Sequence, residues 1–131
     1  MGPSRAELLD VYQRYLACCN DRRHDELGDF VAADVTGSGP VDGLAAYVEG
    51  VAAITTGFPD YRWEPQQVLV DGDTVAVRLR GRGTHRGTFD GIPATGRAVD
   101  VQELVVYRFR DGRIVGCWGD LFPVLRDALA N

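Results

Sequence analysis

The feature that most constrains this chain is the alternation of apolar and polar residues over residues 99–122. Every second residue from Val99 to Phe109 is apolar, with the exception of Glu103. A period of two is typical of a β-strand with one buried face. Asp111-Gly112 follows, and this pair between two such runs indicates a hairpin because glycine tolerates a positive φ. The stretch therefore predicts two paired strands.

The second half of this stretch predicts one apolar face that carries a second carboxylate. The residues expected to share that face are Ile114, Gly116, Trp118, Asp120 and Phe122. Glu103 and Asp120 would then each lie in an apolar setting, which destabilises an ionised carboxylate and raises its pKa toward the range useful for proton transfer. We expect the hairpin to form the floor of a pocket, with Asp120 as its acid–base group.

Composition restricts the class of protein. The 131 residues are 45% hydrophobic and 25% charged, which predicts a single globular domain over residues 1–131. The net charge of −5 disfavours binding to nucleic acid or to an anionic membrane. The sequence contains neither an apolar run long enough to cross a bilayer nor a signal peptide, so we expect a cytoplasmic protein.

Several kinds of chemistry are disfavoured by the residues that the chain lacks. All 14 basic residues are arginine, so a lysine Schiff base is impossible. Three cysteines, two of them adjacent, do not form a disulfide framework. With only two histidines and no Cys-x-x-Cys pair, a structural zinc site is not expected. We therefore predict a protein without metal or cofactor.

The order of predicted elements indicates an α+β fold. Helices are expected over residues 4–20, 24–33, 42–58 and 123–130, and strands over 61–70, 74–85 and the two halves of the hairpin. Helices gathered on one side of a curved antiparallel sheet leave a concave apolar interior suited to a small molecule. Gly81 and Gly83 lie on the inward face of the strand that His85 closes, and they leave room for a bend or for a ligand.

Four segments together resemble the SnoaL-like polyketide cyclases of the nuclear transport factor 2-like superfamily. They are residues 58–60 (FPD), 83–87 (GTHRG), 91–97 (GIPATGR), and the pattern from Arg108 through Asp111-Gly112 and Ile114-Val115 to Trp118. The resemblance covers nearly the whole chain. It implies a cone-shaped, curved antiparallel sheet wrapped around the N-terminal helices, and a homodimer.

The resemblance also implies a reaction and a set of site residues. Asp120 matches the family's general acid–base residue for an intramolecular aldol ring closure, and His85 matches a family histidine that would polarise a carbonyl or tune Asp120. Glu103 is the third catalytic candidate. The substrate would be a polyketide-like small molecule. The residues expected to bind it are Tyr12, Tyr15, Tyr47, Phe58, Trp63, Tyr107 and Trp118.

The reaction itself stays open at this point. Many family members carry a histidine after the Asp-Val segment, whereas Asp34-Val35 is followed here by Thr36. The same fold hosts isomerases, dehydratases, epoxide-opening enzymes and non-catalytic binding modules. A cofactor-free enzyme of the cyclase, isomerase or lyase type is the main hypothesis, and a small-molecule-binding module is the alternative.

Overall fold

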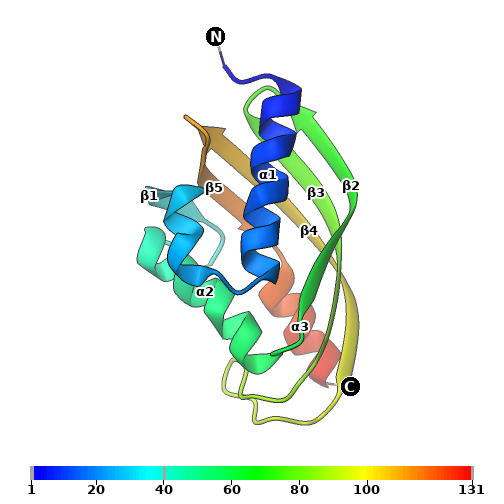
Figure 1. Ribbon diagram of the computed structural model, residues 1–131. Helices are drawn as coiled ribbons and strands as arrows, with labels where there is room; N and C mark the ends of the chain where they lie inside the picture. Colours follow the sequence, from blue (N-terminus) through cyan, green and yellow to red (C-terminus); the bar gives the residue numbers. More distant parts are fainter. Residues whose placement is uncertain (1, 40, 131) are drawn as a thin grey trace.

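The computed structural model describes residues 2–39 and 41–130, and its elements follow the predicted α+β order. The helices are α1 (Arg5–Asn20), the 3-10 helix η1 (His24–Asp29), α2 (Leu44–Gly57) and α3 (Leu121–Ala130). The strands are β1 (Val31–Gly37), β2 (Arg62–Asp71), β3 (Thr74–Thr84), β4 (Ala98–Arg110) and β5 (Arg113–Gly119). Figure 1 shows a curved, unclosed sheet with α1 lying along one face and α2 near the C-terminal end of α1.

The sheet has the strand order β1-β5-β4-β3-β2. The pairs β2–β3, β3–β4 and β4–β5 are antiparallel, and β1 adds to β5 in parallel at one edge. Pro65 lies at an edge and beside a bulge: β2 is the other edge strand, and its register shifts between Pro65 and Gln67. Proline has no N–H to donate to a ladder, which explains this position.

Helix α1 begins where the sequence predicts. The backbone N–H of Glu7 donates to Ser4 Oγ at 3.1 Å, so Ser4 satisfies one of the free amides of the first turn. The apolar stripe of this helix faces the sheet. Its buried residues are Leu8, Tyr12, Tyr15, Leu16, Cys18 and Cys19.

The helix predicted over residues 24–33 is wrong in its second half. Only the 3-10 helix η1 (His24–Asp29) forms, and the chain then enters strand β1. Val31 and Val35 of β1 are buried, and Val31 pairs with Ile114 of β5. The partner that stabilises this strand lies more than 80 positions away in the sequence, so local periodicity could not reveal it. The sheet has five strands rather than about four.

The face predicted for the second strand of the hairpin is wrong beyond Ile114. The β4–β5 pairing passes from Phe109↔Ile114 to Arg108↔Gly116, so β5 has one extra residue there. A bulge of this kind moves every later side chain to the opposite face. Trp118 consequently pairs with Val106 on the outer face and is 46% exposed, whereas Cys117 pairs with the buried Tyr107.

The apolar core fills the space between the helices and the inner face of the sheet. It includes all five tyrosines and Trp63 together with the inward residues of β3 and β4. No helix in the described part of the chain has the length and apolar character needed to cross a membrane.

Candidate active site

Glu103 is the carboxylate that the fold buries. It lies on β4 opposite Leu79 of β3 and is only 7% exposed. The pKa of Glu103 is raised to about 8, chiefly by burial and also by the charge of Asp120, while hydrogen bonding with the Trp63 side chain offsets part of the increase. Oε1 of Glu103 has no hydrogen-bond partner among the described residues. At neutral pH this group is therefore mostly a neutral carboxylic acid with one free oxygen.

Tyrosines from three elements surround this interior. Tyr12 and Tyr15 come from α1, Tyr47 from α2 and Tyr107 from β4. The ring centroids of Tyr12 and Tyr107 are 5.3 Å apart, and those of Tyr15 and Tyr107 are 5.8 Å apart. Burial raises the pKa of all four phenols, so each keeps its proton and can donate a hydrogen bond.

The hydroxyls of Tyr15 and Tyr47 are hydrogen-bonded to each other. The oxygens of Tyr15 and Tyr47 are 2.6 Å apart, and Tyr47 also lies 3.8 Å from Sγ of Cys117. The hydroxyl of Tyr12, in contrast, makes no well-aligned hydrogen bond with a described residue, although it lies close enough to the Tyr107 side chain to interact with it. The tyrosine cluster thus contains one hydrogen-bonded pair, Tyr15 with Tyr47, and a Tyr12 hydroxyl without a well-aligned partner.

Trp63 and Tyr61 form the wall on the β2 side. Their ring centroids are 4.8 Å apart in an edge-on arrangement. The Asn20 side chain holds the Trp63 backbone by accepting from its N–H at 2.9 Å and donating to its carbonyl at 3.0 Å. The Trp63 side chain is buried and reaches the Glu103 carboxyl. These contacts place Trp63 in the interior, where the sequence predicted it.

Tyr61 is the interior residue that the sequence analysis missed. Its hydroxyl lies over Gly81, so a Cβ at that position would overlap it, and its ring also contacts the position of Gly83. The space that the two glycines were expected to leave for a bend or a ligand is therefore occupied by Tyr61. The alternation of Tyr61 with Trp63, opposite inward glycines, was the signal that could have revealed it.

Asp120 lies just beyond the end of β5 and is half-buried. The backbone N–H of Leu104 donates to Asp120 Oδ1 at 2.9 Å. The Asp120 carboxylate thus accepts a hydrogen bond from β4 next to the last residue pair of the β4–β5 ladder, Val105 with Gly119. Its charge raises the pKa of the neighbouring Glu103. The structure thus brings two of the three predicted catalytic residues together electrostatically, and the more deeply buried of the two is Glu103.

His85 lies apart from these carboxylates. It follows the end of β3, six positions beyond Leu79, which is roughly 20 Å along a strand. The backbone N–H of Thr95 donates to Nδ1 at 3.2 Å, and Thr95 Oγ1 lies 2.9 Å from the same nitrogen. Nδ1 is therefore the acceptor, and in the neutral ring the proton is on Nε2. The ring packs on Phe58 at 5.2 Å between centroids, which places Phe58 beside His85 rather than beside Glu103.

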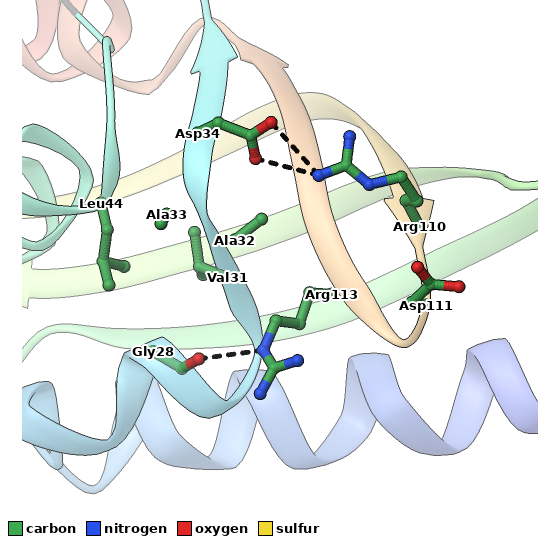
Figure 2. Close-up of a pocket in the computed structure, with 9 residues that line it drawn as sticks. All are labelled: Gly28, Val31, Ala32, Ala33, Asp34, Leu44, Arg110, Asp111 and Arg113. Atoms are coloured by element: carbon green, nitrogen blue, oxygen red, sulfur yellow. Dashed lines mark hydrogen bonds and ion pairs between the residues drawn. The ribbon is translucent and has the colours of Figure 1, made fainter.

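Two cavities open on the outside of the cone. One, of about 420 Å³, lies between β1 and the β4–β5 turn (Figure 2), where Arg110 pairs with Asp34 and Arg113 Nε donates to the carbonyl of Gly28. The other, of about 240 Å³, lies on the outer face of β2, β3 and β4. Neither is lined by Glu103, Asp120 or His85.

Within the described residues, no group of three or more histidine, cysteine, aspartate or glutamate side chains is arranged to hold a metal ion. The arrangement instead supports proton transfer. It combines a buried carboxyl with a raised pKa, neutral phenols and aromatic walls.

This geometry defines the class of protein first. A curved, unclosed sheet around an N-terminal helix is the α+β cone of the nuclear transport factor 2-like type, and structures of that type match the chain over its whole length, with a TM-score of 0.84 and 23% identity for one from Jannaschia. The family model for SnoaL-like polyketide cyclases matches residues 9–127. The chain belongs to this family.

Individual solved structures agree with that assignment. A SnoaL-like polyketide cyclase from Agrobacterium tumefaciens is 33% identical, with a TM-score of 0.79 over 86% of this chain and 89% of its own. IdmH from Streptomyces antibioticus, a proposed polyketide cyclase, is 27% identical, with a TM-score of 0.77 over 95% of this chain and 99% of its own. AclR from Streptomyces galilaeus, a proposed hydroxylase, is 25% identical, with a TM-score of 0.77 over 89% of this chain and 79% of its own. A search of the curated proteins found no significant match.

Proposed function

We propose that the protein is an acid–base enzyme that closes a ring in a polyketide-like substrate, with Glu103 as the group that moves the proton. The observation that carries this proposal is the free Oε1 of a buried carboxyl whose pKa is about 8. A general base or acid works best when its pKa is near the operating pH. Membership of the SnoaL-like family supports the same class of reaction.

The proposed reaction needs one carboxyl and no external reagent. Ionised Glu103 takes a proton from the acidic carbon between two carbonyl groups, which leaves an enolate. The enolate carbon attacks a second carbonyl carbon of the same molecule, so that a carbon–carbon bond forms and an alkoxide results. Protonated Glu103 returns the proton to the alkoxide oxygen. The aromatic interior holds the chain in a folded conformation and excludes water, which favours the intramolecular bond.

In this proposal, Asp120 acts through Glu103. Its carboxylate already accepts from the Leu104 amide, and its negative charge keeps the Glu103 proton in place. The resemblance assigns the general acid–base role to Asp120 itself, and that assignment stays a prediction. The roles of His85 and of the substrate-binding residues also stay predictions.

The test is deuterium exchange at the central carbon of benzoylacetone, a simple aryl β-diketone, followed by proton NMR in heavy water. We expect the wild-type protein to catalyse exchange with a rate that rises with pH through about 8, because the base is the ionised form of Glu103. Glu103→Gln should lose this activity. Glu64→Gln is the matched control, because Glu64 pairs with Arg82 outside the interior, and it should behave like wild type.

Asp120→Asn separates the two carboxylates. If Asp120 acts through Glu103, this variant keeps activity and the midpoint of its pH profile shifts to lower pH. Loss of all exchange in Asp120→Asn, together with full activity in Glu103→Gln, would transfer the catalytic role to Asp120.

A second candidate, a non-catalytic small-molecule-binding module, is favoured by the packing of the interior. Tyr12 and Tyr107, which interact electrostatically with Glu103, pack with Tyr15 and Tyr47 in the buried core, so a ligand must displace some of these rings. A wild-type protein that binds benzoylacetone without exchanging its protons would support the module and contradict the enzyme.

A further inference from the structure

Three polar atoms in the interior lack hydrogen-bond partners among the described residues. They are the hydroxyl of Tyr12, the hydroxyl of Tyr61 and Oε1 of Glu103, and all three side chains are more than nine-tenths buried. Buried polar atoms in native proteins nearly always have a partner, because an unpaired one loses its hydration without compensation. A fourth such atom, Nε2 of His85, lies at the distant end of β3.

The register of the sheet brings Tyr61 close to Glu103. The Tyr61 hydroxyl lies over Gly81. In the β3–β4 ladder Glu103 pairs with Leu79 and Val101 pairs with Gly81, so Gly81 is the diagonal neighbour of Glu103 on the inner face. Diagonal positions lie roughly 7–8 Å apart. The Glu103 carboxyl hydrogen-bonds with the side chain of Trp63, whose strand partner is Gly81, while its Oε2 lies 3.5 Å from the position that a Cβ on Gly119 of β5 would occupy. The Tyr61 hydroxyl and the Glu103 carboxyl therefore lie in the same part of the interior, with Trp63 between their strands.

Tyr12 approaches Glu103 from helix α1, whereas Tyr61 approaches it from the sheet. It projects from α1, and its ring packs on Tyr107, which lies on the same strand and the same face as Glu103. Burial raises the pKa of Tyr12 and of Tyr61, and the Glu103 charge adds to both increases, so both phenols remain protonated and lie within the electrostatic range of Glu103. They are therefore hydrogen-bond donors, unlike Tyr15 and Tyr47, which already bond to each other.

We infer that Tyr12 and Tyr61 donate hydrogen bonds to the carbonyl oxygen next to the carbon that Glu103 deprotonates. This inference rests on the proposed function and adds the hydrogen-bond donors that stabilise the negative charge on the substrate oxygen. When Glu103 removes the proton, negative charge develops on that oxygen, and donors already in place stabilise the charge without reorganisation. The phenols keep their protons throughout. The substrate class is then a β-diketone or β-keto ester with one enolisable carbonyl held inside the cone.

The test uses Tyr12→Phe and Tyr61→Phe in the benzoylacetone exchange assay. Each change removes one oxygen and keeps the ring, and near-ultraviolet circular dichroism verifies the packing. We expect each variant to slow exchange by roughly 10- to 100-fold, since a single such donor is worth that much or more in other enzymes. The midpoint of the pH profile should stay near that of wild type, because the pKa of Glu103 is set by burial, Asp120 and Trp63, and a phenylalanine keeps the ring that buries it. Thr55→Val, which removes a hydroxyl from α2, is the control and should keep the wild-type rate.

The outcomes separate this inference from the proposed function. Wild-type rates in both tyrosine variants, with Glu103→Gln inactive, would overturn the inference alone. Full activity in Glu103→Gln, or no exchange by the wild-type protein, would overturn both. A crystal soaked with benzoylacetone gives a second measurement that does not depend on rates. A ketone oxygen within hydrogen-bond distance of both phenols supports the inference, and a ketone oxygen bound elsewhere contradicts it.

Discussion

At the scale of single residues, Glu103 illustrates how burial creates an acid–base group. The same residue type on the sheet surface, Glu64, pairs with Arg82, whereas Glu103 is surrounded by aromatic side chains and faces the charge of Asp120. Removal from water disfavours the charged form, and a like charge nearby disfavours it further. The raised pKa is therefore a property of the position rather than of the residue.

This position predicts a pH-dependent stability. The pKa of Glu103 is about 8 in the folded chain against an ordinary 4.5, so between these values the unfolded chain loses the proton first. The free energy of unfolding should fall by about 1.4 kcal/mol per pH unit across that window, or about 3 kcal/mol from pH 4.5 to pH 7. Glu103→Gln should remove this slope and Glu64→Gln should not, as measured by urea unfolding at several pH values. An equal slope in Glu103→Gln and wild type would contradict the assignment.

At the scale of elements, two glycines show how the same residue type serves different purposes. Gly81 of β3 makes room for the Tyr61 hydroxyl, whereas Gly50 of α2 has no atom near the position of a Cβ. In a helix interior glycine is unfavourable relative to alanine because it has more conformational entropy to lose. The strand glycine is required by packing and the helix glycine is not.

A matched pair of alanine substitutions tests this difference. Gly50→Ala should raise the free energy of unfolding by about 0.5–1 kcal/mol. Gly81→Ala should lower it by about 1–3 kcal/mol because the added methyl group displaces the Tyr61 ring. Thermal unfolding followed by circular dichroism measures both. Equal effects in the two variants would show that Tyr61 does not depend on Gly81.

At the scale of the whole molecule, the outer face of the sheet carries exposed apolar side chains that take no part in the interior site. Leu69, Leu104, Val106 and Trp118 are exposed on it, and Leu69 is 57% exposed. The pairings Leu69↔Ala76, Ala76↔Val106 and Val106↔Trp118 place an apolar row across four strands. An exposed apolar patch of this kind is typical of a protein–protein interface.

We propose that this face forms the homodimer that the family resemblance implies. Light scattering at micromolar concentration should give the mass of a dimer. Val106→Glu should shift it to the mass of a monomer, because a charge in the middle of the apolar row opposes association. Ala45→Glu introduces the same charge on the exposed surface of α2 and should leave the dimer intact. A wild-type monomer, or a dimer in both variants, would contradict the proposal.

The local elements were determined by the sequence itself. Ser4 caps α1 at the predicted start of that helix, Pro65 marks an edge strand with a register shift, and Asp111 and Gly112 both adopt positive φ in the hairpin turn. Each of these depends on interactions within a few residues, so alternation and turn chemistry were sufficient. The inward position of Glu103 followed from the same alternation and is confirmed.

What the sequence could not determine depends on contacts between distant segments. Strand β1 forms because β5 offers it a partner, and a single bulge reverses the face of Trp118. His85 shares the inner face with Glu103, yet the second half of β3 separates them. Desolvation and free hydrogen-bonding capacity arise only when several elements close around a group. For that reason only the tertiary structure could show that the buried polar atoms of Glu103, Tyr12 and Tyr61 have no aligned hydrogen-bond partner among the residues it describes.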